Sequence, residues 1–177
     1  MHSPSIQAEV PPVDNCCEKE LFAFFGLVAY SAQVLEHSAL NLALVLKLAK
    51  VGEIAKRDFY DIYENLTKHT FGRLITSAKK LIQISEDQER ILKDAVDLRN
   101  HVTHHYFRER AEDFVSIAGQ SEMKKEMQKF IARFKEADQL MTSLYQPLWN
   151  EYGVTEEYVD TQMEKLLSKA QERDRNA

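Results

Sequence analysis

Apolar residues recur along most of this 177-residue chain at the three- and four-residue spacing of amphipathic helices. The first such segment, residues 18–50, is apolar over most of its circumference, which is typical of a helix surrounded by others. Glycine and proline are scarce, which also favours helices over many short strands. Later helices are expected to begin at residues that favour the N-cap position, namely Asp58, Thr70, Ser85, Ser121 and Thr155.

Local signals suggest where individual helices begin and end. Ser85 and Gln88 have the spacing of a capping box, and the helix that they open should fray after about Arg110. Residues 119–121 (Gly-Gln-Ser) interrupt the apolar pattern, so we expect the next helix to start at Ser121. Pro147 should end or kink that helix, because proline lacks an amide hydrogen.

The helix expected after Ser121 carries an a/d seam of apolar residues over more than three heptads. We interpret it as a long bundle helix that packs on residues 18–50 and on the helix that Ser85 opens. The alternative is an intermolecular coiled coil. The seam consists of Met123, Met127, Phe130, Phe134, Ala137, Met141, Leu144 and Leu148.

The sequence as a whole predicts an all-α protein, an antiparallel, up-and-down helical bundle of about five to six helices. We expect one bundle domain over residues 17–170, because no linker divides the chain. Residues 1–16 hold three of the four prolines without periodicity and should form a flexible arm. Residues 171–177 are polar and should form a disordered tail.

Composition and charge limit the partners and the cellular compartment that the sequence suggests. The net charge of −5 gives no overall attraction to nucleic acid, so any RNA contact must come from a local patch or from two copies meeting. The adjacent Cys16 and Cys17 form no framework of spaced pairs, which favours a reducing compartment. Met1 to Asn15 contains no secretory signal, and polar residues interrupt the apolar segment 21–48. We therefore expect a cytoplasmic protein with no membrane partner.

Side chains able to take part in catalysis or binding are most concentrated in residues 99–106, where an Arg, an Asn, three His and a Tyr occur within eight positions. On a helix, Arg99 and Tyr106 lie nearly on one line, and Asn100 and His104 form a parallel row. Arg99 and His104 are five residues apart, about 140° round a regular helix. They converge on one point only if the helix end distorts or if two copies pool their side chains.

These residue types suit cleavage of an RNA phosphodiester without a metal or other cofactor. The guanidinium of Arg99 fits phosphate oxygens and stabilises added negative charge. The imidazole of His104 can take or give a proton near neutral pH while the ribose 2′-OH attacks its own phosphate. The side chain of Asn100 can orient the imidazole or the substrate. Short basic clusters at Lys79-Lys80, Arg108 with Arg110, and Lys124-Lys125 with Lys129 could support an RNA path.

The Arg99-Asn100-x-x-x-His104 pattern resembles the signature of HEPN domains, small helical bundles of which many are ribonucleases. The resemblance implies a HEPN-like fold, a homodimer through the helix that bears the motif, and catalytic roles for Arg99, Asn100 and His104. With Tyr106 added, the pattern is also similar to the toxins of HEPN/MNT toxin–antitoxin pairs. That similarity implies a partner nucleotidyltransferase, which attaches AMP to Tyr106 as a regulatory modification.

Other interpretations of the same residues stand beside this one. Arg99 can pair with a carboxylate such as Glu36, and His104 can be a surface histidine at a helix C-terminus, where positive charge is favourable. Tyr106 and Phe107 can be core aromatics. The whole protein can also be a non-catalytic module that holds a nucleotide, an RNA or a protein partner in a dimer cleft.

A second pattern overlaps the first. Asp97, His101, His105 and Glu109 are spaced by four and form an acid-His-His-acid stripe that could hold a divalent metal. A solvated row of charge and imidazole is the more common explanation of such a stripe, so we expect no metal site.

Overall fold

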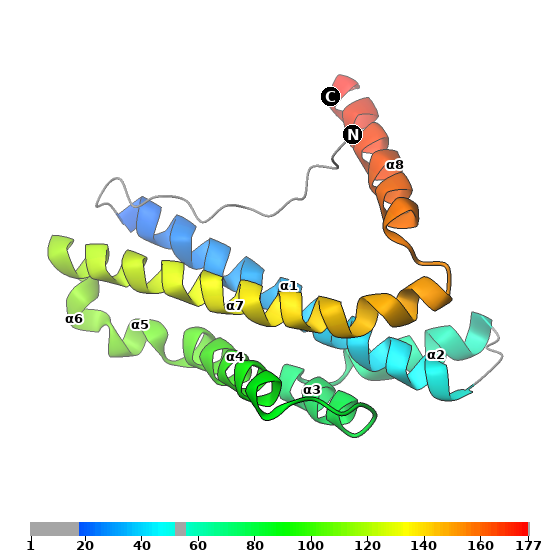
Figure 1. The fold of residues 1–177 in the computed structure, drawn as a ribbon. Helices are drawn as coiled ribbons and strands as arrows, with labels where there is room; N and C mark the ends of the chain where they lie inside the picture. Colours follow the sequence, from blue (N-terminus) through cyan, green and yellow to red (C-terminus); the bar gives the residue numbers. More distant parts are fainter. Residues whose placement is uncertain (1–17, 52–55, 177) are drawn as a thin grey trace.

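The computed structural model describes residues 18–51 and 56–176; the arm expected at residues 1–16 lies outside them. Within these ranges every regular element is a helix, which confirms the all-α prediction (Figure 1). They hold eight helices, more than the five to six expected, because the end of the motif-bearing segment divides into two single turns. The helices are α1 (Glu18–Val51), α2 (Lys56–Thr67), α3 (Phe71–Lys79), α4 (Glu86–His104), α5 (Tyr106–Glu109), α6 (Ala111–Phe114), α7 (Ile117–Glu151) and α8 (Glu156–Arg175).

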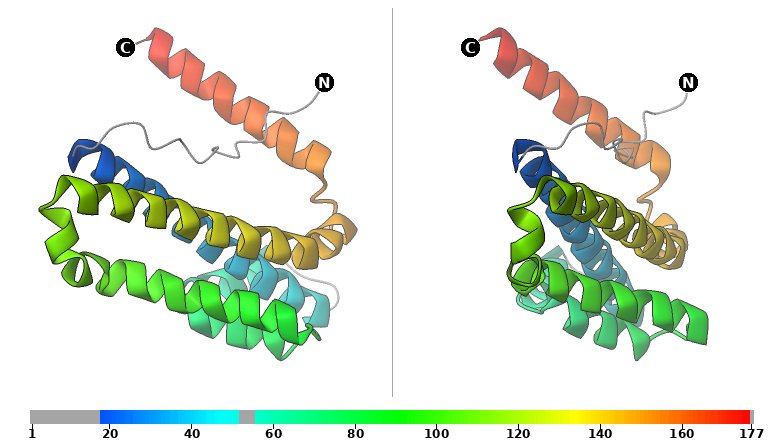
Figure 2. Two further views of the ribbon diagram at one scale, coloured as in Figure 1. Left: turned by 60° about the vertical axis from the view of Figure 1, so that its left-hand side comes forward. Right: turned by 90° about the vertical axis from the view of Figure 1, so that its left-hand side faces the viewer.

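The two longest helices, α1 and α7, lie side by side and run parallel (Figures 1 and 2). Near their N-terminal ends the Lys124 ammonium donates to the Glu20 carboxylate. Further along, the Ser38 hydroxyl donates to Asp138. Because the earlier residue of α1 meets the earlier residue of α7 and the later meets the later, the two helices run in the same direction. The first and the last long helix of the bundle are thus direct neighbours, an arrangement that the sequence pattern did not specify.

Helix α4 runs in the opposite direction to α1 and α7. Near its C-terminal end the Arg99 guanidinium donates to Glu36 of α1. Eight residues later the ring of Phe107 packs on Phe25, which lies nearer the start of α1, with ring centroids 4.8 Å apart. The antiparallel part of the prediction thus holds for α4, whereas the α1–α7 pair is parallel.

The apolar seam predicted on α7 is the centre of the core. Leu144 and Leu148 are partly buried against a small second cluster at the far end, and the other six seam residues are buried. Because α7 uses this seam against α1 and α4, the interpretation as a bundle helix is confirmed. None of the described helices combines the length and the hydropathy that crossing a bilayer requires. The buried seam residues are Met123, Met127, Phe130, Phe134, Ala137 and Met141.

The expected start of α7 at Ser121 is wrong. The helix begins at Ile117, and the Ser116 hydroxyl caps it by accepting from the Gly119 amide at 3.3 Å. Gly119 lies inside the helix, where a Cβ would stand 2.4 Å from the backbone of Asp113 in α6. The glycine therefore marks a close approach of two backbones, not a helix end. Pro147 does not end α7 either, since the helix continues to Glu151.

Three of the other four expected helix starts agree with the structure, whereas Asp58 lies inside α2, which begins at Lys56. Ser85 and Gln88 form both hydrogen bonds of a capping box at the start of α4. Thr155 caps α8 by accepting from the Tyr158 amide at 3.3 Å. Thr70 occupies the N-cap of α3, but its side chain makes no capping hydrogen bond.

Helix α8 extends from the end of α7 and stands apart from the bundle (Figure 2). It continues through Arg175, so residues 171–175 are helical and do not form the expected disordered tail. Acidic side chains at its first turn and basic ones at its last complement the helix dipole, which favours a helix in this polar segment.

Two glycines give opposite stability predictions. Gly119→Ala should lower the free energy of unfolding by about 1–3 kcal/mol, because the added methyl overlaps the α6 backbone. Gly26→Ala should raise it by about 0.5–1 kcal/mol, since Gly26 lies within α1 and a Cβ there meets no atom within 4 Å. Urea denaturation followed by circular dichroism measures both. Equal effects of the two substitutions would contradict the close approach at Gly119.

Candidate functional site

Helix α4 presents the motif residues on two of its faces. Its buried stripe packs into the bundle, which leaves Arg99 half-buried at the edge nearest α1. Asn100 and His104 lie on the exposed face. The backbone stays helical through His104 and departs from helical geometry at His105, where φ is −129°. The buried stripe consists of Leu92, Ala95, Leu98 and Val102.

The Arg99 side chain is held in place by α1. Its Nε donates to the Glu36 carboxylate, which confirms the pairing considered from the sequence. The side chains of Arg99 and Glu36 are 28% and 32% exposed, so this ion pair is only partly screened by water. One terminal nitrogen, Nη1, lies 3.4 Å from Oδ1 of Asn100. Glu36 thus fixes the Arg99 guanidinium at Nε, and the Nη1 nitrogen of Arg99 lies beside Asn100.

His104 is exposed at the C-terminal end of α4, the position expected of a surface histidine near helix carbonyls. Its ring centroid lies 6.2 Å from that of His105. The distortion at His105 follows both motif residues, so it does not turn His104 toward Arg99. Within one chain the two side chains remain about 140° apart round the helix. Convergence through a second copy stays a prediction.

Tyr106 belongs to the core and not to the Arg99 face. The break at His105 places it in α5, where it is 1% exposed and its hydroxyl donates to the Met123 carbonyl at 3.2 Å. Burial and the neighbouring Glu126 carboxylate raise the pKa of the Tyr106 hydroxyl well above its usual value. Its interpretation as a core aromatic is confirmed. Modification by AMP requires a hydroxyl that reaches solvent near Arg99, and this condition is not met.

The stripe of Asp97, His101, His105 and Glu109 does not form a metal site. The break at His105 ends the regular spacing on which the stripe depends. The ring of His101 packs edge-on against Phe130, with centroids 6.3 Å apart, and its Nδ1 lies 3.6 Å from Oε2 of Glu109. Over residues 18–51 and 56–176, no group of three or more His, Cys, Asp or Glu side chains is placed to bind a metal ion.

The basic clusters are largely committed to contacts within the chain. Lys124 is fully buried and donates to Glu20, so it cannot meet an external RNA. Arg110 forms a two-pronged contact with Glu126, at 3.0 and 2.6 Å, and its hydrogen bond to that carboxylate raises the pKa of the guanidinium. Lys79 donates to Glu89. These pairings leave less free positive charge than the sequence suggested.

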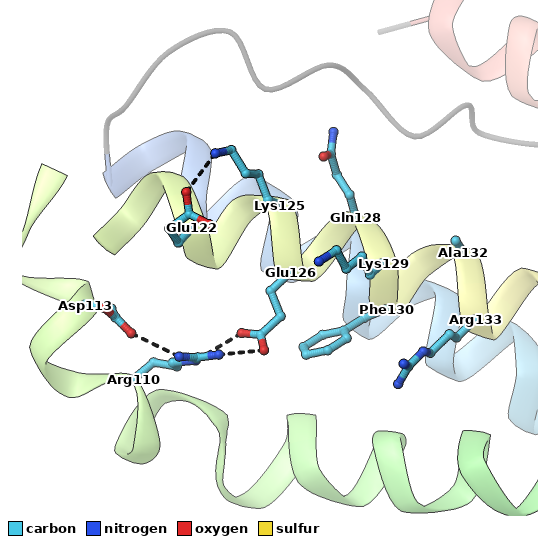
Figure 3. A pocket seen from close by; sticks show the side chains of 10 residues that line it. All are labelled: Arg110, Asp113, Glu122, Lys125, Glu126, Gln128, Lys129, Phe130, Ala132 and Arg133. Carbon is cyan, nitrogen blue, oxygen red and sulfur yellow. Dashed lines mark hydrogen bonds and ion pairs between the residues drawn. The ribbon is translucent and has the colours of Figure 1, made fainter. Parts of the chain in front are cut away.

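Arg110 and Glu126 line a groove of about 1050 Å³ between α5–α6 and α7 (Figure 3). Phe130 forms part of its wall, and Arg133 points from α7 toward α4. Glu122 also lines the groove, and the hydrogen bond that its carboxylate accepts from Lys125 lowers the pKa of Glu122. The charges along this groove largely neutralise one another.

The structure also reveals a smaller cavity of about 260 Å³ beside Glu36, which the sequence reasoning missed. It lies between α1, α2 and the start of α3, and Nδ1 of His69 is buried there without a hydrogen-bond partner among the described residues. The only sequence feature that pointed to this cavity was the pair of polar residues, Glu36 and His37, within the apolar α1 segment. The cavity is lined by Gln33, Glu36, His37, Leu40, Tyr63, Leu66, Thr67, His69 and Leu74.

Comparisons with known proteins found no matching family model, no matching curated protein and no matching solved structure. The resemblance to HEPN domains therefore rests on the motif residues and on their place at the end of α4.

The buried Tyr106 hydroxyl predicts a loss of stability in alkali. Because its pKa is raised on folding, its contribution is complete below about pH 10, the usual pKa of tyrosine, and is lost as the pH rises above that value. Tyr106→Phe should lower the unfolding free energy by about 0.5–1.5 kcal/mol at neutral pH through the lost hydrogen bond. That difference should shrink above pH 10.

Urea titrations at several pH values between neutrality and pH 11 measure this difference. Tyr158→Phe, in the exposed α8, provides the matched control and should leave the pH profile unchanged. A pH-independent difference between wild type and Tyr106→Phe would show that the Tyr106 hydroxyl does not have the raised pKa.

Proposed function

We propose that this protein is a HEPN-like, metal-independent endoribonuclease that acts as a homodimer through α4. The observation that carries the proposal is the Glu36–Arg99 pair beside Asn100. A guanidinium fixed at Nε is preorganised to offer its terminal nitrogens to phosphate oxygens. Asn100 and His104 lie on the exposed face of the same helix, where a bound strand would have access to them.

In this mechanism the ribose 2′-oxygen attacks the adjacent phosphorus, and the bond from phosphorus to the 5′-oxygen breaks. His104 of one copy accepts the 2′-OH proton, and a water molecule donates a proton to the leaving 5′-oxygen. Arg99 stabilises the additional negative charge on the non-bridging oxygens. The products are a 2′,3′-cyclic phosphate and a 5′-hydroxyl end. Asn100 orients the imidazole or the substrate by hydrogen bonds.

The need for two copies follows from helical geometry. Arg99 and His104 of one chain point about 140° apart, so a single α4 does not direct both at one phosphate. Two α4 helices that face each other across a twofold axis can direct Arg99 of one copy and His104 of the other into a shared cleft. The buried Tyr106 hydroxyl gives no support to a toxin role with a nucleotidyltransferase, so the proposal does not include one.

A non-catalytic binding module is the second candidate. The net charge of −5 and the commitment of Lys124 and Arg110 to carboxylates of the same chain favour it, because both weaken attraction to RNA. In that case the α4 cleft would hold a nucleotide, an RNA or a protein partner without cleaving it. Binding of RNA that remains intact would distinguish this module from the enzyme.

The cleavage proposal is tested with purified protein and single-stranded RNA in EDTA. Wild type should cleave, and His104→Ala should lower the rate by about 10²–10⁴, the usual contribution of a general acid–base group. Arg99→Ala should cause a loss of similar order through the missing charge stabilisation. Analysis of the product ends should find 2′,3′-cyclic phosphates.

His105→Ala is the matched control, since His105 is an adjacent exposed histidine outside the proposed site. It should retain wild-type cleavage. Thermal unfolding of each variant separates a lost catalytic group from a lost fold. Cleavage that survives both Arg99→Ala and His104→Ala, or no cleavage by wild type, would overturn the assignment of the enzyme.

A further inference from the structure

Helix α8 carries an apolar surface that the rest of the chain leaves uncovered. It has 20 residues, none of them buried, and it stands away from the bundle in both views of Figure 2. A polar helix in isolation would need no such surface, and exposed apolar patches on soluble proteins commonly mark contact sites. The large apolar side chains that α8 exposes are Tyr158, Val159, Met163, Leu166 and Leu167.

Part of this surface has the spacing of a coiled-coil seam. Val159, Met163, Leu166 and Ala170 follow one another at intervals of four, three and four residues, the alternation of a and d positions. One step further in each direction the same stripe ends in a charged residue, Glu156 before it and Arg173 after it. An apolar seam closed by opposite charges at its two ends has a preferred orientation for a partner.

We propose that α8 pairs antiparallel with α8 of a second copy of this chain. In an antiparallel pair, an a position of one helix packs beside a d position of the other. Centred between Met163 and Leu166, this register places Met163 beside Leu166 of the second copy. It also places Val159 beside Ala170 of the second copy. The seam of each helix is thereby covered by the seam of its twin.

The charged ends of the seam select the orientation. In the antiparallel register, Glu156 lies beside Arg173 of the second copy at both ends of the contact. A parallel, in-register pair would instead set Glu156 against Glu156 and Arg173 against Arg173. Opposite charges at these positions therefore favour the antiparallel pair, and like charges disfavour the parallel one.

The wider charge distribution of α8 agrees with this orientation. Residues 156–164 carry only acidic charges, and residues 165–175 carry an excess of basic ones. Antiparallel pairing brings each acidic half beside a basic half and also opposes the two helix dipoles. The acidic half contains Glu156, Glu157, Asp160 and Glu164; the other half contains Lys165, Lys169, Arg173 and Arg175 with Glu172 and Asp174.

The contact is small, because a 20-residue helix is about 30 Å long. Two such helices bury an area at the lower end of specific interfaces, so the association should be reversible at micromolar concentration. It involves none of Arg99, Asn100 and His104, so substitutions in α8 leave the proposed α4 contact in place.

Sedimentation equilibrium of the full-length chain tests the surface. Leu166→Glu should halve the mass of the assembly, because it places two carboxylates in the seam. Ser168→Glu adds the same charge on the opposite side of α8 and should leave the mass unchanged. Since α8 contributes no buried residue, both variants should unfold at the wild-type temperature. A wild-type monomer, or an unchanged mass for Leu166→Glu, would overturn the proposal.

Charge reversal tests the orientation. Glu156→Arg and Arg173→Glu should each weaken self-association about tenfold, because each turns two attractive pairs into repulsive ones. An equimolar mixture of the two variants should restore association, since every facing pair is again of opposite charge. Single reversals without effect would exclude the antiparallel register. A mixture that fails to associate would show that Glu156 and Arg173 are not partners.

Discussion

Packing of the α7 seam against α1 in parallel is the interaction on which the rest of this fold depends. Most of the buried apolar residues in the described part of the chain lie on these two helices, and the buried contact between Lys124 and Glu20 accompanies their packing. A lysine ammonium removed from water without its carboxylate would destabilise the protein by several kcal/mol, so displacement of the two helices is unfavourable. The Ser38–Asp138 hydrogen bond adds a second fixed point. Together these polar contacts define the register of the pair that the apolar seam holds together.

The position of the candidate site follows from this pair. Helix α4 packs against both α1 and α7, and its buried stripe leaves one edge next to Glu36 and the opposite face in solvent. Arg99 lies at that edge, whereas Asn100 and His104 lie on the exposed face. The same docking brings Tyr106, beyond the break at His105, under the Met123 carbonyl of α7. One chain thus supplies an oriented arginine and an accessible histidine, with the tyrosine removed from the surface.

Local signals in the sequence predicted local structure well. The capping box of Ser85 and Gln88 and the cap at Thr155 were predictable because their hydrogen bonds join residues three apart. The Glu36–Arg99 pair could be anticipated because a polar residue in an apolar helix needs a partner. Gly119 misled the prediction, since its partner is the backbone of Asp113 in another helix and not the chain around it. The cavity beside Glu36 had only the weak signal of two polar residues in α1.

The sequence by itself determined the helical class, three of the five expected N-cap positions, the buried seam of α7 and the short list of residues able to do chemistry. Periodicity and capping act over a few residues, so they can be recognised in a linear pattern. Tertiary structure alone decided that α1 and α7 are parallel neighbours, that Lys124 and Tyr106 are buried, and that α8 remains uncovered. Each of these depends on contacts between distant residues; Lys124 and Glu20 are 104 positions apart. No local pattern encodes which distant surface a side chain will meet.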